Sequence, residues 1–171
     1  MRFLPLLTAA AVLAWPAAAP AAEVFAGLHA HGVKTRLSLD ADREGGADLS
    51  LGVRGGGIAG TPLQPYAMAS LNLAGGTNFL VGGLSARFGE RVYVRPGLGL
   101  AIHDGSASNF QLPDRLAFGS RILFEPEVGV GARINERMTI EASWVHLSHA
   151  TLLGRQNPGI DNIGVRLNLA L

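Results

Sequence analysis

A histidine and a serine in the last third of the chain have types and a spacing that suit nucleophilic catalysis. His146 and Ser148 lie two positions apart in residues 140–150, where apolar and polar side chains alternate. Side chains on a β-strand point to opposite faces with period two, so both residues share one face. Because Ile140 and Trp144 occupy the same face, it is the apolar one. A base beside a hydroxyl on an apolar surface predicts a hydrolase whose substrate is itself apolar.

A carboxylate follows after a short turn. Asp161 comes after Asn157-Pro158-Gly159-Ile160, and its parity in residues 160–170 places it with the aliphatic Ile163 and Val165. A carboxylate facing lipid is costly unless it is paired, so His146 is its expected partner. A carboxylate on the far imidazole nitrogen holds the tautomer that accepts the serine proton. The pattern leaves a second interpretation open, in which Ser148 and Asp161 are ordinary polar residues where strands meet loops.

The sequence pattern around these residues predicts β-strands along the whole chain after the N-terminal segment. Period-two alternation recurs between clusters of Gly, Pro, Asn and Asp, and no segment has the 3.6-residue period of a long amphipathic helix. The predicted strands are 24–33, 47–54, 65–74, 77–88, 91–103, 119–134, 137–150 and 160–170. Short turns and long loops connect them, which is typical of an outer-membrane barrel. We therefore predict an all-β fold, an eight-stranded antiparallel transmembrane β-barrel.

Alternation alone does not separate a membrane barrel from a soluble barrel or sandwich, because a soluble fold would turn the apolar face inward. Three features favour the membrane: an N-terminal export signal, strands of about ten residues, and small or charged residues on the polar face that could fill a narrow interior. Two features point the other way. Aromatic residues are few, and the chain ends in Asn168-Leu169-Ala170-Leu171 without a terminal aromatic residue.

Residues 1–22 have the composition of a cleaved secretory signal peptide. Met1-Arg2 begins the segment with positive charge, an apolar stretch runs from Leu4 to Trp15, and small residues precede a predicted cleavage after Ala21 or Ala22. The apolar stretch is too short and too interrupted by Pro for a membrane anchor. A buried N-terminal helix is the alternative. We expect residues 23–171 to form the barrel, in the outer membrane of a bacterium.

Composition excludes several classes of partner. The chain has 14 basic and 13 acidic residues, and removal of residues 1–22 takes away only Arg2, so the remainder is neutral. A neutral chain argues against binding nucleic acid. With no cysteine there is neither a disulfide framework nor thiol chemistry. No phosphate loop or dinucleotide fingerprint is present, and we expect no cofactor. An oligomer is neither predicted nor excluded.

Two further sets of residues could suggest other chemistry. His29 and His31 could form a metal pair, but no third ligand has a useful spacing, so an interior or rim position is expected. The second set could provide paired carboxylates for glycoside hydrolysis, yet its parity places every member inside a barrel too narrow for a sugar. We expect it to form a buried charge network; it comprises Glu125, Glu127, Glu141, Arg95, Arg133 and Arg166.

Two segments, residues 144–150 and 156–166, resemble the PagL-type lipid A 3-O-deacylases, which are also described as acyloxyacyl hydrolase-like. The resemblance implies an eight-stranded outer-membrane barrel with a Ser-His-acid triad on its lipid-facing surface, which removes the acyl chain ester-linked at the 3-position of lipid A. It further implies Ser148 as nucleophile, His146 as general base and Asp161 as the acid that orients it. Lipid A, within lipopolysaccharide, is then the expected substrate, and outer-membrane lipid the surroundings.

The chain departs from the family pattern at two positions. His149 stands where the family commonly has an Asn with a role at the oxyanion site, so backbone N–H groups at Ser148 or around Gly154 are alternative donors. The acid is Asp161 where the family often has Glu. The principal rival hypothesis is a non-catalytic structural or adhesin-like barrel, and a soluble periplasmic lipid-binding barrel is a third.

Overall fold

The sheet of this protein closes on itself. The computed structural model describes residues 21–38, 40–110, 112–113 and 115–171, in which each strand pairs antiparallel with the next and β8 pairs with β1. The elements are β1 Glu23–Ala30, η1 Ala41–Arg43, β2 Ala47–Arg54, η2 Ile58–Gly60, β3 Leu63–Asn72, β4 Phe79–Ala86, β5 Val92–His103, β6 Ile122–Arg133, β7 Met138–Leu147 and β8 Ile160–Ala170. The predicted eight-stranded antiparallel barrel is confirmed.

Residues 1–20 of the predicted signal peptide lie outside the described residues. Within the described part of the chain, no helix has both the length and the apolar character needed to cross a membrane. The first described residues join the sheet at once, because Leu171 N–H donates to Ala22 O at 2.9 Å.

Strand ends differ from the prediction where the chain turns. β2 and β8 have the predicted bounds, whereas β1 ends at Ala30 rather than at residue 33. The reason is Gly32, whose φ of +67° turns the chain away from the ladder. At the other end of the sequence β7 stops at Leu147, yet Ser148 still exchanges two main-chain hydrogen bonds with Phe124, at 3.1 and 2.7 Å. Ser148 therefore keeps a strand-like position beside His146.

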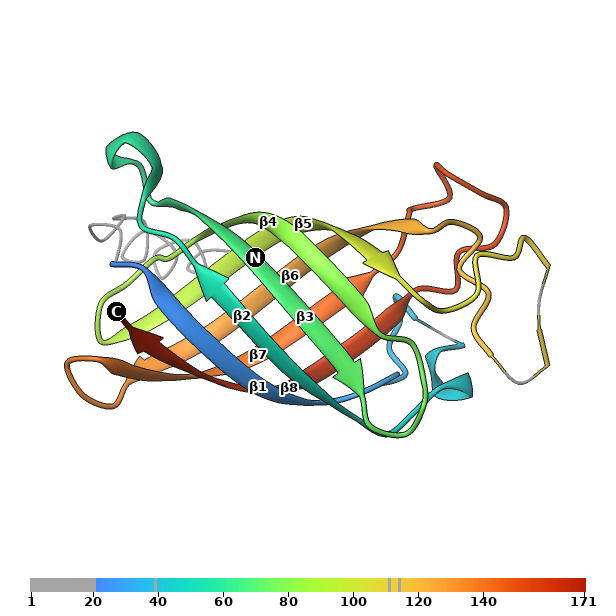
Figure 1. Cartoon of the computed structure of the whole chain (residues 1–171), viewed down its shortest axis with the longest axis horizontal. Coiled ribbons are helices and arrows are strands. Elements are labelled where there is room, and N and C mark those ends of the chain that lie inside the picture. The colour runs from blue at the N-terminus through green and yellow to red at the C-terminus, as the bar shows by residue number, and fades with distance from the viewer. Residues whose placement is uncertain (1–20, 39, 111, 114) are drawn as a thin grey trace, which may run out of the picture.

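The connections divide between the two ends of the barrel (Figure 1). At the left of the view, where β1 begins and β8 ends, lie the connections 55–62, 87–91 and 134–137. The opposite end carries the connections 31–46, 73–78, 104–121 and 148–159. The expected alternation of short turns and long loops is thus not strict, because the 55–62 connection lies with the termini. The loops that follow β1, β5 and β7 gather at the far end.

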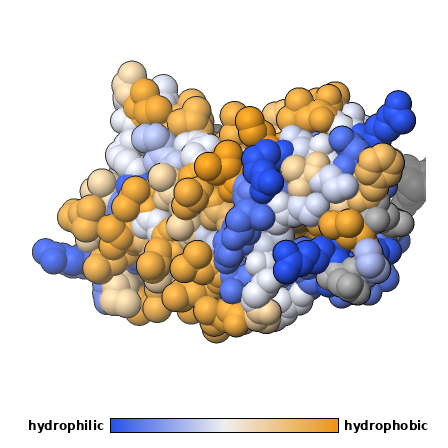
Figure 2. Space-filling model, turned by 45° about the vertical axis from the view of Figure 1, so that its right-hand side comes forward, coloured by the Kyte–Doolittle hydropathy of each residue, from blue (hydrophilic) through white to orange (hydrophobic). Residues whose placement is uncertain are grey.

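The outward face of the barrel is aliphatic. Leu28 is 58% exposed and Leu98 61%, and similar residues cover every strand. Figure 2 shows hydrophobic side chains over much of the barrel wall, with more hydrophilic surface toward the end that bears the long loops. A soluble barrel would bury these residues. Exposed aliphatic side chains on all sides instead match a lipid-facing wall, as in outer-membrane barrels.

The inward face carries charges that neutralise one another. Arg95 Nη1 lies 2.7 Å from Glu23 and 3.2 Å from Glu141, and Arg166 Nη1 lies 2.6 Å from Glu127. These side chains are almost completely buried, which requires such pairing. The predicted internal charge network is present. Glu125 is buried as expected, but it accepts a hydrogen bond from the Tyr66 hydroxyl instead of forming an ion pair with an arginine. Arg133 differs from the prediction, because it is the last residue of β6 and lies exposed at the rim.

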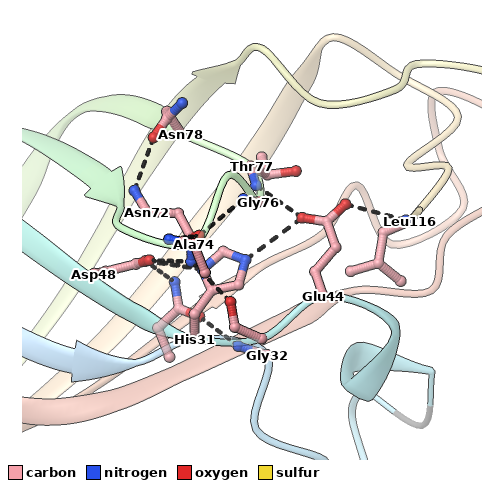
Figure 3. A network of polar contacts seen from close by, with 12 residues as sticks. His31, Gly32, Glu44, Asp48, Asn72, Ala74, Gly76, Thr77, Asn78 and Leu116 are labelled. Carbon is pink, nitrogen blue, oxygen red and sulfur yellow. Dashed lines mark hydrogen bonds and ion pairs between the residues drawn. The ribbon is translucent and has the colours of Figure 1, made fainter. Parts of the chain in front are cut away.

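A network of polar contacts holds the loop 31–46 against the open end of the barrel (Figure 3). His31 Nδ1 lies 2.9 Å from Asp48 on β2, and its Nε2 lies 3.5 Å from Glu44. Glu44 in turn accepts hydrogen bonds from the main-chain N–H groups of Thr77 at 2.8 Å and Leu116 at 3.1 Å. Three loops that are distant in sequence are therefore tied together through one carboxylate.

The charges in this network shift each other's titration. Burial by itself lowers the pKa of His31, but the carboxylates of Asp48 and Glu44 outweigh it and raise the pKa from 6.5 to about 9. Burial likewise raises the pKa of Glu44, whereas hydrogen bonds from His31, Thr77 and Leu116 lower it from 4.5 to about 2. His31 is consequently a cation, and Glu44 an anion, at neutral pH.

This ion pair predicts a pH window for loop stability. A raised His31 pKa contributes stability below pH 6.5 that is lost as the pH rises through about 9. A lowered Glu44 pKa contributes stability above pH 4.5 that is lost as the pH falls toward about 2. We expect His31→Gln to lower the thermal unfolding midpoint most between these limits, at pH 4.5–6.5, and to have little effect above pH 9. Unfolding followed by circular dichroism across this pH range measures it, and a midpoint difference independent of pH contradicts it.

Candidate active site

His146 contacts both of the other residues that the sequence singles out. Its Nε2 lies 2.9 Å from Ser148 Oγ, and its Nδ1 lies 2.8 Å from Asp161 Oδ1. The two ring nitrogens of an imidazole have opposite roles when the ring is neutral. With the proton on Nδ1 donated to the carboxylate, Nε2 is an acceptor for the serine hydroxyl. The three residues thus form one continuous hydrogen-bonded chain.

Strand pairing explains why these three side chains meet. His146 on β7 and Asp161 on β8 are direct partners in the antiparallel register, so their side chains lie next to each other on the same face. Ser148 follows two residues later and points the same way. Further down β8, Ile163 and Val165 share the parity of Asp161 and are exposed, at 43% and 47%. The group therefore lies on the outer wall at its loop-bearing end.

Asp161 is held by donors other than His146. Trp144 Nε1 donates to Asp161 Oδ1 at 2.8 Å, and the Thr35 hydroxyl donates to Asp161 Oδ2. The Trp144 ring also stacks on His146, with centroids 5.8 Å apart. Hydrogen bonds to a carboxylate are stronger than those between neutral groups, and they favour its charged form. An outward-facing carboxylate is thereby satisfied within the protein.

The loop 31–46 covers the histidine and the aspartate. Although both face outward, Asp161 is completely buried and His146 is only 7% exposed. Val33 N–H donates to Asp161 O at 2.8 Å, and Ser38 Oγ lies 3.4 Å from His146 Nδ1. Ser148 remains partly exposed. The nucleophile candidate is therefore accessible from the lipid side, whereas its two partners are shielded.

Sequence reasoning missed the contributions of Thr35 and Ser38. Both lie in a loop at least 100 positions before the start of β7, and no periodicity connects the two segments. Trp144 was visible on the same face as His146, but its hydrogen bond to Asp161 was not. The one signal in the sequence was indirect: a carboxylate that faces lipid needs polar partners, and residues 31–46 form a polar loop that could supply them.

The other candidate histidines do not join this site. His29 faces the interior, where its Nε2 lies 2.7 Å from Ser143 Oγ, and His31 belongs to the loop network. In the part of the chain that the structure describes, no group of three or more His, Asp or Glu side chains is arranged to hold a metal ion. The two histidines are therefore accounted for by contacts within the protein.

Comparisons with known proteins bear on the family and the fold of this chain. A family model described as lipid A 3-O-deacylase (PagL) matches residues 26–170. The crystal structure of the outer-membrane enzyme PagL is similar over 87% of this chain and 99% of its own, with a TM-score of 0.62 and 18% identity. A designed transmembrane β-barrel is similar over 88% of this chain and 97% of its own, with a TM-score of 0.52 and 10% identity.

No curated protein matches the sequence. The two structural likenesses bear on the fold alone at these identities, so membership rests on the family model, which spans nearly the whole barrel from β1 to β8. The chain belongs to the PagL family of lipid A 3-O-deacylases, proteins of the bacterial outer membrane.

Proposed function

We propose that this protein is an outer-membrane esterase that hydrolyses the ester-linked acyl chain at the 3-position of lipid A. In this proposal Ser148 is the nucleophile, His146 the general base, and Asp161 the acid that orients the base. The observation that carries it is the position of His146, 2.9 Å from Ser148 Oγ and 2.8 Å from Asp161 Oδ1, on a wall that faces lipid. We further propose that residues 1–22 are removed during export.

The reaction follows from the hydrogen-bonded chain. His146 Nε2 takes the hydroxyl proton as Ser148 Oγ attacks the ester carbonyl carbon, which gives a tetrahedral oxyanion. When this intermediate collapses, the bond to the sugar oxygen breaks and His146 returns the proton to that oxygen. Water then hydrolyses the acyl-Ser148 ester by the same steps. Asp161 stabilises the imidazolium that forms twice in the cycle.

The surroundings suit a substrate held in the membrane. The acyl chain of the substrate would lie along the aliphatic wall, on which Ile163 and Ile140 are exposed below the site. In the loop 148–159, Leu152 and Leu153 are also exposed, at 72% and 52%. The non-catalytic barrel is not favoured, because such a barrel has no need of a lipid-facing Ser, His and Asp in mutual contact.

The direct test is the lipid A of cells that express the protein. We expect mass spectrometry to find the loss of one hydroxyacyl chain with the wild type and none with Ser148→Ala, since loss of the nucleophile costs about 1000-fold or more in rate. Ser143→Ala is the matched control, because it removes a hydroxyl from the inward face of the same strand. Unchanged lipid A in cells that contain well-folded wild type would refute the proposal.

Thr35 offers a second test, of the acid and the loop that holds it. Thr35→Val removes the hydroxyl that donates to Asp161 without changing side-chain volume much. We expect kcat/KM to fall about tenfold, equivalent to about 1.4 kcal/mol of transition-state stabilisation. Thr35→Ser retains the hydroxyl and is expected to stay within about twofold of wild type. Equal activity of the Val and Ser variants on purified lipid A would show that Thr35 does not support the acid.

A further inference from the structure

The side chain of Trp144 contacts the acid and the base of the candidate site at the same time. Its Nε1 donates to Asp161 Oδ1 at 2.8 Å, and its ring stacks on the His146 ring with the two planes 21° apart. His146 Nδ1 lies 2.8 Å from the same carboxylate oxygen. Because a carboxylate oxygen has two lone pairs, Asp161 Oδ1 can accept from both rings at once.

Strand geometry brings Trp144 to this position. It precedes His146 by two residues on β7, so the two side chains share the outward face. In the antiparallel register His146 pairs with Asp161 on β8, which places the indole diagonal to the acid and within reach of it. The acid, the base and the indole are therefore held by one pair of hydrogen-bonded strands, and this arrangement needs no contact from a loop.

A tryptophan on a lipid-facing wall could serve only as a membrane anchor, so the direction of its N–H matters. An interfacial anchor places its apolar ring in the lipid and its N–H toward water and headgroups. The N–H of Trp144 donates to Asp161 instead, and the side chain is partly buried. An anchoring role does not require this contact.

The acid has a second donor, which comes from a loop. Thr35 in the loop 31–46 donates to Asp161 Oδ2, whereas Trp144 donates to Oδ1 from the sheet. The same loop covers the acid, which is completely buried. A displacement of the loop would remove the Thr35 hydrogen bond and leave the one from Trp144. The two donors therefore support the acid independently of each other.

We infer that Trp144 is a positioning residue, whose indole N–H holds Asp161 Oδ1 against His146 Nδ1 and thereby keeps Nε2 directed at the Ser148 hydroxyl. The inference rests on the proposed function. Positioning of this kind affects the transition state most, because the imidazolium that the carboxylate stabilises forms only during the reaction. Loss of a hydrogen bond to a charged group is expected to cost about tenfold or more in rate.

Trp144→Phe tests this role, because it removes the N–H and keeps an aromatic ring on the wall. We expect kcat on purified lipid A in mixed micelles to fall about tenfold or more, with KM within about twofold. Val128→Ala is the matched control, since Val128 is the exposed partner of Trp144 on β6 and its side chain is purely apolar. It is expected to keep kcat within about twofold.

A double variant tests whether Trp144 acts through the acid. Trp144→Phe combined with Thr35→Val removes the donors to both carboxylate oxygens. We expect its loss in kcat to exceed the product of the two single losses, because neither donor then compensates for the absence of the other. A purely structural effect of Trp144 on the wall predicts losses that simply multiply.

Vibrational spectroscopy tests the hydrogen bond without any need for activity. In a chain with Trp15→Phe, Trp144 is the only tryptophan, so its indole N–H can be followed by ultraviolet resonance Raman spectroscopy. We expect a hydrogen-bonded signal that weakens when Asp161→Ala is added and persists when Ser148→Ala is added. A signal that does not respond to Asp161→Ala would overturn the inference.

The kinetic outcomes separate this inference from the proposed function. A heat-modifiable gel shift verifies that each variant is a folded barrel. Folded Trp144→Phe with wild-type kcat, an equal loss in Val128→Ala, or losses that simply multiply in the double variant would each overturn the inference. If the wild type is active and Ser148→Ala is not, these results leave the proposed function intact. An inactive wild type overturns the proposed function, and the Raman signal then still decides whether Trp144 holds the acid.

Discussion

Main-chain polar groups inside a bilayer have no water to bind, so each must find a partner within the chain. The closed ladder that runs from β1 through β8 and back to β1 meets this requirement for every strand. Closure also gives the sheet an inside and an outside, and the period of two then sorts side chains between them. Aliphatic residues face lipid, while Arg95, Arg166 and their acidic partners neutralise one another in the interior. The loops and the candidate site are built on this barrel, which has an aliphatic outer wall and a charged interior.

The candidate site departs from this pattern, because it places polar side chains on the lipid-facing wall. His146 and Asp161 face outward, where an unpaired charge would be costly, and they lie at the loop-bearing end of their strands. Pairing with each other, the Trp144 and Thr35 donors, and cover from the loop 31–46 together remove that cost. Glu44 ties the same loop to the connections 73–78 and 104–121, so the cover over the site depends on contacts among three loops.

Ser148 and His149, which are neighbours at the end of β7, have different roles. Ser148 keeps a partly exposed hydroxyl toward lipid, whereas the buried His149 ring braces the loop 148–159. The exchange of Asn for His at this position is therefore compatible with a working site only if another group serves the oxyanion. The turn that precedes β8 is tied to the same loop, because Asn157 Oδ1 accepts a hydrogen bond from His149 N–H at 2.9 Å.

The order of residues was enough to predict the fold class, the outward parity of His146, Ser148 and Asp161, and which charged side chains face inward. The reason is that a period of two is a local property that short-range sterics impose. Membership of the family was visible in the final thirty residues, and it is confirmed, whereas the catalytic roles stay a prediction. Only the tertiary structure placed Thr35 and Ser38 beside the acid and the base, put Arg133 at the rim, and showed that Ser148 N–H is taken by Phe124. These contacts join segments separated by long stretches of chain, and their geometry follows from barrel closure and loop packing, which no local pattern records.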